Sequence, residues 1–541
     1  MKICKFGLSK FRSIDKLMLI IPQDKPLILF GPNNAGKSNI LSAINRMFGE
    51  RYPTYIDVED SDYFMRNQEK YPKITLSARF NKPFVYNNKG LNTKTLCVVY
   101  GFNGKKEENV FCDGKNELYV ASEHRKQIQS FLLDTERNAN YHFNYSNKYS
   151  LLSKINKSLH NSLTSNDREK LSESFKEIKQ VFEEKSEFTD MFDVFQNSIE
   201  NSVKGFIHHL KADFSAYDPN NFAKSLRINA HENNDIRSFE EFGTGEQQIL
   251  IMALAKAYMQ MFKNENFIFI LEEPEANLHP LAQKWLKKYI YDLCKSGIQV
   301  IMSTHSPNFI NPSNLEGLVR VYKKDGITKV KQLDNNSLKE LLVDTGVPKD
   351  KIGKNNLGEF FELKLDQEQL EGLFAKTVVL VEGSTEKIVL PIWLEREDFS
   401  LPAEGVEIIN CMGKNNIPTL YRIYKAYGYR VICVFDGDVI NHNRNKDNNL
   451  FKKILGDFES DIFESHQAYV TGDNYLCFSV DYETTVRSLI GDSHYNKLSK
   501  NNHIGSKPGV AKYIALNSEK VPSFIPSLIN IIQANSTDEI I

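Results

Sequence analysis

The sequence predicts an α/β fold in more than one domain, and three observations lead to this prediction. Apolar runs that are typical of strands alternate with stretches of helical periodicity at both ends of the chain. Several of these runs lead directly into glycine or carboxylate residues, first after Phe30 and Leu271 and later after Val381 and Phe435. The length of 541 residues also exceeds what a single hydrophobic core usually supports.

We expect three successive parts. An α/β domain at residues 1–335 carries an insertion at about 120–215, where apolar residues recur at helical spacing, among them Met191, Phe195 and Ile199. A helical linker at 336–375 and a second α/β domain at 376–541 follow. The insertion is predicted to serve dimerisation. An ordinary amphipathic part of the core is the alternative, because a pattern alone does not show what an apolar stripe contacts.

Composition limits the classes of function. The 68 Lys and Arg residues against 69 Asp and Glu residues leave the chain near neutral, so nucleic-acid contacts must come from local basic patches. The seven cysteines show no C-x-x-C pair or regular spacing, which indicates reduced thiols. The sequence shows neither a signal peptide nor an apolar run near the roughly 20 residues of a membrane span. We therefore predict a soluble, cytoplasmic protein without membrane contact.

The first strand leads into Gly31-Pro-Asn-Asn-Ala-Gly-Lys-Ser38, which fits the phosphate-binding pattern G-x-x-x-x-G-K-[ST]. Glycines let backbone N–H groups surround the phosphates, the lysine reaches the terminal phosphates, and the serine hydroxyl can hold Mg²⁺. A chance glycine-rich turn is disfavoured, because the strand required by the pattern is present. The residues predicted to bind ATP and its metal are Gly31, Asn34, Gly36, Lys37, Ser38 and Asn39.

Two later strands end in residues suited to phosphate chemistry. Glu272 is placed to hold Mg²⁺ through water, and Glu273 to polarise the water that attacks the γ-phosphate. About 30 residues on, a third apolar strand ends at His305. A lone histidine is more often structural. After the preceding motifs, this one resembles the γ-phosphate sensor of ABC-type ATPases.

The segment Phe242–Gln248 occupies the place of the ABC signature loop but departs from its S-G-G-Q pattern at Gly243 and Thr244. Gly245 and the helix that follows still offer N–H groups to a phosphate. In ABC proteins this loop closes on the nucleotide of a second subunit, so the resemblance implies a homodimer or larger homo-oligomer. The opening Lys10-Phe11-Arg12 resembles the recombination and chromosome-maintenance branch, and a transporter subunit is the alternative.

The second domain carries an ordered set of acids after two strands. Glu382 and Glu386 follow the first strand, and Asp436 and Asp438 follow the second. Carboxylates at the C-terminal ends of neighbouring parallel strands converge in one crevice, and oxygen ligands favour Mg²⁺ or Mn²⁺. The pattern resembles the Toprim domain. The alternative is that these acids cap helices and bind water.

An ABC-type ATPase with a helical insertion and a C-terminal Toprim domain resembles the OLD (overcoming lysogenization defect) family of ATP-dependent nucleases nearly end to end. Its most specific stretches here are Ile270–Pro280, Ser303–Pro307 and Leu373–Glu386. The resemblance assigns a late acidic position to Glu483, with Asp481 as a helper, and a catalytic lysine to Lys507. An isolated lysine or glutamate on a polar segment is otherwise solvated surface.

The resemblance implies a DNA endonuclease that binds and hydrolyses ATP and cuts by two-metal phosphodiester hydrolysis under nucleotide control. Its catalytic residues would be Glu273, Glu382 and Lys507, with the other acids as metal ligands. Family members act as antiphage effectors, alone, beside a helicase in Gabija systems, or beside a reverse transcriptase and its DNA product in retrons. The alternative is an ABC-type DNA clamp or repair ATPase whose Toprim unit binds DNA or partners without cleaving.

Overall fold

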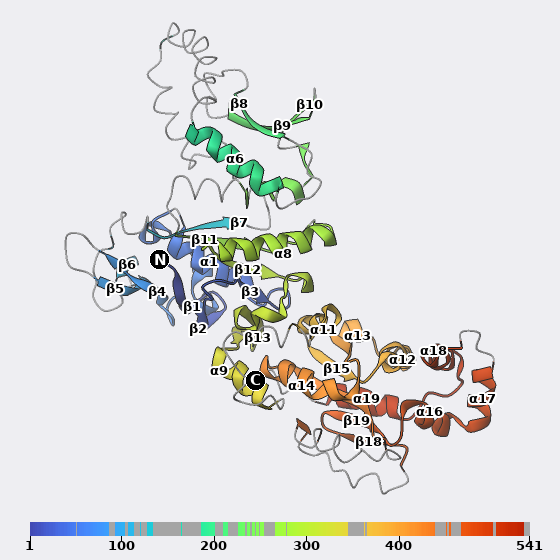
Figure 1. Cartoon of the computed structure of the whole chain (residues 1–541). Coiled ribbons are helices and arrows are strands. Elements are labelled where there is room, and N and C mark those ends of the chain that lie inside the picture. The colour runs from blue at the N-terminus through green and yellow to red at the C-terminus, as the bar shows by residue number, and fades with distance from the viewer. Residues whose placement is uncertain are drawn as a thin grey trace. The chain divides into compact units, whose positions relative to one another are not determined.

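The structure is a computed structural model, shown in Figure 1. It describes residues 1–49, 51–85, 92–102, 107–112, 120, 127–133, 164, 186–200, 209–214, 226–232, 235–238, 241–243, 245–247, 249–250, 252–253, 266–276, 278–344, 362, 365–438, 451, 454–455, 467–500 and 505–534. The chain divides into two compact units. The first comprises Met1–Leu29 and Gly36–Phe309, and the second Phe30–Ala35 and Ile310–Ile541. None of the described helices combines the length and apolarity needed to cross a membrane.

The first unit begins with an antiparallel sheet of strand order β2-β1-β4-β5-β6. Alternating side chains of β2 are buried, which is the period-two pattern of a sheet with one face on the core. The strands are β1 (Ile3–Phe11), β2 (Ile14–Ile20), β4 (Lys73–Val85), β5 (Asn92–Phe102) and β6 (Glu107–Cys112).

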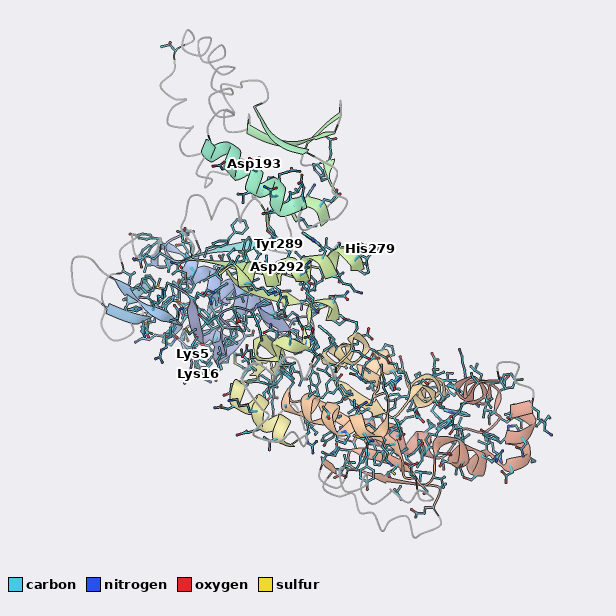
Figure 2. All side chains as sticks on the ribbon, viewed as in Figure 1. Lys5, Lys16, Asp193, His279, Tyr289 and Asp292 are labelled. Carbon is cyan, nitrogen blue, oxygen red and sulfur yellow. The ribbon has the colours of Figure 1, made fainter. Side chains whose placement is uncertain are left out.

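A second layer of this unit holds the strands that carry the predicted nucleotide residues. Adjacent strands are β3 (Leu27–Phe30), β12 (Gln299–Thr304), β11 (Phe267–Glu272) and β7 (Gln129–Leu133), and β11 is parallel to both of its neighbours. The side chains of β3 and β12 are all buried, as expected of strands covered on both faces. The helices packed on this layer are α1 (Lys37–Phe48) and α8 (Pro280–Lys295). Figure 2 shows His279 at the start of α8, with Tyr289 and Asp292 further along it.

The predicted insertion at about 120–215 is only partly helical in the described residues. Helix α6 (Ser186–Glu200) buries Phe195 and Ile199, as their spacing predicts. The two ends are strands instead, because β7 joins the sheet beside β11 and β8 (His209–Phe214) begins a small antiparallel sheet. That sheet has the order β10-β9-β8, with β9 at Leu226–Glu232 and β10 at Asp235–Ser238. Leu171, Phe175 and the rest of that predicted helix lie outside the described residues.

The second unit contains a mixed sheet of order β16-β15-β17-β19-β18, parallel except for β18. Among the described residues, a hairpin and two helices precede this sheet, namely β13 (Leu318–Lys324), β14 (Ile327–Gln332), α9 (Asn335–Asp344) and α11 (Gln367–Glu371). The sheet consists of β15 (Thr377–Val381), β16 (Val406–Asn410), β17 (Arg430–Asp436), β18 (Tyr469–Gly472) and β19 (Tyr475–Phe478). Its helices are α12 (Ser384–Glu395), α13 (Leu401–Glu404), α14 (Ile417–Ala426), α16 (Tyr482–Ile490), α17 (Asp492–Lys500), α18 (Lys507–Asn517) and α19 (Phe524–Gln533).

A buried junction inside the second unit joins the β13–β14 hairpin to the turn that precedes β17. The Arg320 guanidinium donates to the carbonyl oxygens of Tyr427 (3.0 Å) and Gly428 (2.6 Å) and lies 3.7 Å from the ring centre of Tyr429. Phe30, at the end of β3, packs edge-on against Tyr427 with ring centres 6.0 Å apart. The residue that precedes the phosphate-binding loop therefore contacts the element that leads into β17.

Candidate nucleotide and metal sites

Helix α1 begins with the predicted phosphate-binding lysine. Gly36 caps the helix at φ +108°, a conformation that favours glycine, and Ser38 is exposed in the first turn. The Lys37 side chain is buried, and burial lowers the pKa of Lys37 to about 8, although the charges of Glu273, Glu275 and Glu272 act in the opposite direction. A buried ammonium group at a helix N-terminus is stabilised by an anion, which is what a nucleotide phosphate supplies.

Glu273 and His305 face each other across the ends of β11 and β12. The Glu273 Oε1 atom lies 3.2 Å from His305 Nε2. Glu273 has φ +45°, and its N–H group donates to the Ser303 carbonyl oxygen at 3.1 Å. A left-handed backbone is costly for glutamate and marks functional sites in many proteins. Burial and then the charge of Lys37 lower the pKa of His305 and favour the neutral imidazole, although the charge and hydrogen bond of Glu273 act in the opposite direction.

Glu275 belongs to the same site, although sequence reasoning gave it no role. Its Oε1 atom accepts hydrogen bonds from Thr304 Oγ1 (2.9 Å) and from the His305 N–H group (2.6 Å). Burial raises the pKa of Glu275. The carboxylate thus holds the end of β12 where His305 stands. The position of Glu275, two residues after Glu273 in the turn that follows an apolar strand, was the signal that could have identified it from the sequence.

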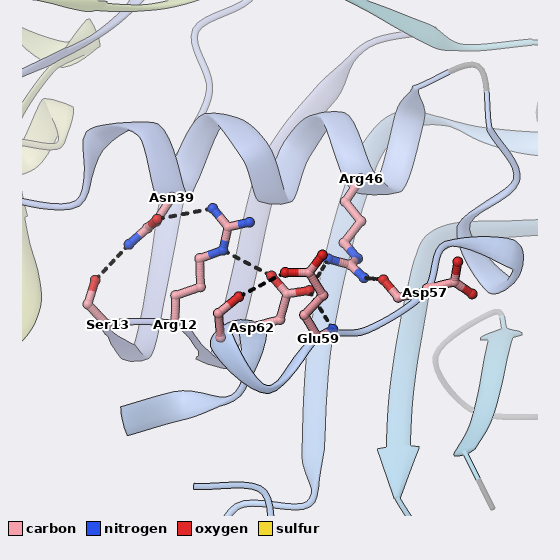
Figure 3. A network of polar contacts seen from close by, with 8 residues as sticks. Arg12, Ser13, Asn39, Arg46, Asp57, Glu59 and Asp62 are labelled. Carbon is pink, nitrogen blue, oxygen red and sulfur yellow. Dashed lines mark hydrogen bonds and ion pairs between the residues drawn. The ribbon is translucent and has the colours of Figure 1, made fainter. Parts of the chain in front are cut away.

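A polar network holds α1 from the side of the β1–β2 turn (Figure 3). Arg12 Nε bonds to Asp62 Oδ1 at 3.0 Å, and Arg46 bonds to Asp62 Oδ2 at 2.7 Å. The Asn39 amide accepts from Arg12 at 3.3 Å and donates to Ser13 at 2.9 Å. Asn39, predicted to bind nucleotide, is therefore bonded in this structure to the turn after β1, which fixes the first turn of α1.

The first residues of the phosphate-binding loop, up to Ala35, belong to the second unit. Gly31 has φ +143°, and a Cβ atom there would lie 2.0 Å from the Val321 carbonyl oxygen, so the position requires glycine. Asn34 has φ +60°, and its Oδ1 atom accepts from Lys323 Nζ at 3.1 Å. The β13–β14 hairpin thus supports the loop.

The signature-like segment starts a helix, as expected. The Gln247 N–H group donates to the Gly243 carbonyl oxygen at 3.0 Å, and Gly245 lies in this first turn. The Glu246 carboxylate accepts from the Gly243 N–H group at 3.3 Å. Thr244 and Gln248 lie outside the described residues.

In the second unit the predicted metal ligands Glu382 and Asp436 meet at the C-terminal edge of the sheet. Strands β15 and β17 are parallel neighbours with Val381 opposite Val434, so each strand delivers its acid to the same edge. The Asp436 N–H group donates to Glu382 Oε2 at 3.4 Å, and Asp436 Oδ1 accepts from the Tyr482 N–H group at 3.2 Å.

The charges of these acids are poorly compensated. Burial, followed by the charges of Glu382 and Glu386, raises the pKa of Asp436 to about 8. Burial also raises the pKa values of Glu382 and Glu386. Glu386 Oε2 accepts from the Gly383 N–H group at 3.1 Å. Gly383 is the N-cap of α12, which begins at Ser384.

Asp438 lies two residues past β17 and bonds to a lysine that sequence reasoning missed. Its Oδ2 atom is 2.9 Å from the Nζ atom of Lys414, which also donates to the Asp436 carbonyl oxygen. Asp438 has φ +52°. Lys414 follows β16 by four residues, and a position just beyond the C-terminal end of a parallel strand was the signal that could have found it.

The late residues Asp481, Glu483 and Lys507 come from two helix starts. Asp481 Oδ1 accepts from the Thr484 N–H group at 2.7 Å and so caps α16. Glu483 Oε2 lies 2.9 Å from Lys507 Nζ. Although burial opposes its charge, the hydrogen bond and charge of Glu483 raise the pKa of Lys507. The charges of Asp481 and Glu483 also contribute to the raised pKa of Asp436, so these two acids lie within electrostatic range of it.

The donor set of this carboxylate cluster fits a hard divalent cation. The described acids Glu382, Glu386, Asp436, Asp438 and Glu483 offer only oxygen atoms, as Mg²⁺ and Mn²⁺ prefer. Within the described residues, no three acidic, histidine or cysteine side chains are placed so that they could hold a metal ion as they stand. Glu386, Asp438 and Glu483 bond instead to a backbone N–H group and two lysines. A cation would relieve the repulsion that raises the pKa values of the buried acids.

Two family matches and three relatives agree with an ATPase site followed by a carboxylate site in one chain. Residues 27–311 match the family described as "AAA domain, putative AbiEii toxin, Type IV TA system". Residues 373–438 match "Overcoming lysogenization defect protein-like, TOPRIM domain". The OLD nuclease of Thermus scotoductus is 25% identical over 80% of this chain and 82% of its own length. The Old nuclease of Escherichia phage P2 is 23% identical over 82% of this chain and 78% of its own length. Endonuclease GajA of Bacillus cereus is 20% identical over 84% of this chain and 76% of its own length.

Among solved structures, an SMC head bound to the C-winged helix domain of ScpA covers 62% of this chain and 99% of its own, at 16% identity and a TM-score of 0.41. The strand order and the two family matches define the fold. They confirm the predicted fold class, an α/β ABC-type ATPase domain followed by a C-terminal Toprim domain. The chain belongs to the OLD family of nucleases, enzymes that join an AAA-type ATPase domain to an OLD-like Toprim domain.

Proposed function

We propose that this protein is a DNA endonuclease that requires Mg²⁺ or Mn²⁺ and is controlled by ATP. The observation that carries the proposal is the pairing of Glu382 and Asp436 on adjacent strand ends, where burial raises the pKa of both carboxyl groups and the charge of Glu382 raises the pKa of Asp436 further. The same chain holds Lys37, Glu273 and His305 in a second site suited to nucleotide phosphates. Carboxylates held in this way are stabilised by divalent cations, which nucleases use for phosphodiester hydrolysis.

The residues of the second unit divide the chemistry among them. When bound at Glu382, Glu386, Asp436, Asp438 and Glu483, with Asp481 as a helper, a divalent cation supplies Lewis acidity and an activated water. Lys507 neutralises charge that develops on the phosphate oxygens.

In the ATPase site, Lys37 and Ser38 bind phosphate and metal, and Glu272 supports the metal. Glu273 polarises water beside the sensor His305.

We also propose how this activity is organised in the cell. The ATPase domain spans residues 1–335, the linker 336–375 and the nuclease domain 376–541, with the insertion at about 120–215 mediating contacts between copies in a homo-oligomer. An antiphage role in the cytoplasm is part of the same proposal, because the resemblance to the OLD family implies it, and the relative named Endonuclease GajA supports the endonuclease activity. A helicase, or a reverse transcriptase with its DNA product, is the partner class proposed for such a system.

The test uses purified full-length protein with plasmid and linear DNA, Mg²⁺ or Mn²⁺, with and without ATP. We predict that Glu382→Ala and Asp436→Ala abolish DNA cleavage and leave ATP hydrolysis intact, because each removes a metal ligand outside the ATPase site. Glu404→Ala, an exposed acid of the same domain, is the matched control and should cut like the parent. Undiminished cutting by both site variants would reject the nuclease site. Metal and DNA binding without cutting by the parent would instead indicate a clamp.

A further inference from the structure

One loop of the second unit connects the two strand ends that carry the metal-binding acids. This loop, Cys411–Asn416, follows β16 and leads into α14. The Gly413 N–H group donates to the carbonyl oxygen of Glu382 at 2.8 Å. The next residue, Lys414, donates from Nζ to the carbonyl oxygen of Asp436 and to Asp438 Oδ2. The loop therefore holds the main chain at the ends of both β15 and β17.

The Lys414 ammonium group is a fixed part of the fold. Its side chain is 8% exposed, and Nζ lies 5.9 Å from the ring centre of Phe435 and 6.0 Å from that of Phe451. Asn416 fixes the loop by donating from Nδ2 to the Cys411 carbonyl oxygen at 2.9 Å. A buried ammonium group is costly unless its N–H groups are bonded, so Lys414 depends on the two aspartates for its place.

Asp438, by contrast, has little else to orient it. Its N–H group donates to the Val480 carbonyl oxygen at 3.1 Å, which fixes the backbone, but the side chain is 37% exposed. The hydrogen bond that orients its carboxylate within the described residues is the one from Lys414 to Oδ2. That bond leaves the second oxygen, Oδ1, to serve as a ligand.

We propose that Lys414 is a positioning residue of the nuclease site: it fixes Asp438 and the end of β17 in the arrangement that a divalent cation needs. The inference rests on the proposed nuclease function. Partners that orient metal ligands typically contribute about 10- to 100-fold in metal affinity. Lys507 differs in kind, because its side chain is 64% exposed and can reach a substrate, whereas Lys414 is enclosed by protein.

The experiment measures Mn²⁺ binding by titration calorimetry to the metal-stripped full-length protein. Lys414→Met should weaken Mn²⁺ binding and so raise its dissociation constant by about 10- to 100-fold. Lys414→Arg keeps a cation and its donors and should recover part of the loss. Lys425→Met, on the neighbouring helix α14, is the matched control and should bind Mn²⁺ like the parent. Unchanged or tighter binding by Lys414→Met would overturn the proposal, because it would make the lysine a mere counter-charge.

A double-mutant cycle separates positioning from a general structural role. If Lys414 acts through Asp438, then Lys414→Met should have little further effect on Mn²⁺ binding in an Asp438→Asn background. An equal loss in both backgrounds would contradict the proposal. ATP hydrolysis reports on whether each variant folds. If Lys414→Met does not fold, Lys414→Gln takes its place, and the same weakening of Mn²⁺ binding is expected. Absence of Mn²⁺ binding in the parent would refute the nuclease function itself.

Discussion

Lys507 is bonded to Glu483 at the exposed edge of the carboxylate cluster, and this contact predicts its part in cleavage. If its charge offsets the charge that develops on the phosphate, Lys507→Ala should slow DNA cleavage by about 100-fold or more and leave DNA binding nearly intact. Cleavage rates and DNA affinity are compared with those of Lys512→Ala, an exposed lysine on the same helix. An equal loss of binding would identify Lys507 as a DNA-backbone contact.

Asp436 predicts how the metal-free protein responds to pH. Its pKa in the folded protein is about 8 against an ordinary 3.8, so the folded state keeps a proton that the unfolded chain releases. Stability should therefore fall as the pH rises from about 4 to about 8. Asp436→Asn removes this loss and should raise the free energy of unfolding at pH 8 by at least about 1 kcal/mol, since one pKa unit corresponds to about 1.4 kcal/mol.

Thermal unfolding in a chelator at about pH 5 and pH 8 checks this prediction. The gain from Asp436→Asn should be larger at the higher pH, and Mg²⁺ should stabilise the parent more than the variant. Asp473→Asn, which alters an exposed acid in the turn between β18 and β19, is the control. A gain that is independent of pH would show that burial does not raise the pKa of Asp436 in solution.

At the scale of elements, the strands were predictable where both faces are buried. The runs that became β3, β15 and β17 are apolar stretches whose residues are nearly all buried, and the parallel register of β15 and β17 brings Glu382 and Asp436 to one edge. Strand β7 was not predictable, because its pairing partner β11 lies more than 130 residues away in sequence. Lys414 was missed for the same reason, since it contacts Asp436 and Asp438 through the fold and not through a local motif.

The contact between β13 and the turn before β17 gives an element-scale prediction. Arg320→Met removes two hydrogen bonds and leaves the buried carbonyl oxygen of Tyr427 and the half-buried one of Gly428 without their donor. Each unsatisfied buried group costs about 1–3 kcal/mol, so the free energy of unfolding should fall by at least that amount. Denaturant unfolding checks it, with Lys331→Met on the opposite strand β14 as the exposed control. Equal stability of the two variants would show that water replaces the guanidinium.

At the scale of the whole molecule, the division into compact units bears on how the two sites communicate. Residues Phe30–Ala35 of the phosphate-binding loop belong to the same unit as the nuclease sheet. Val321 contacts this loop at Gly31, and Arg320, the preceding residue of β13, bonds to the turn that leads into β17 and Asp436. A change in the loop on nucleotide binding therefore has a route through packed residues of β13 to the turn before β17.

Two ATPase variants measure that coupling. Glu273→Gln keeps the phosphate contacts but loses the group that polarises water, so ATP should bind without turnover and hold subunits closed through the Gly243–Glu246 segment. Lys37→Ala loses the phosphate contact, so closure should be rare. If closure controls the nuclease, the two variants must shift DNA cleavage in opposite directions relative to the parent, because they populate opposite states. Cleavage and ATP hydrolysis are measured together, with Lys284→Ala on α8 as the control, and matching effects from both substitutions would mean that the ATPase does not control the Toprim site.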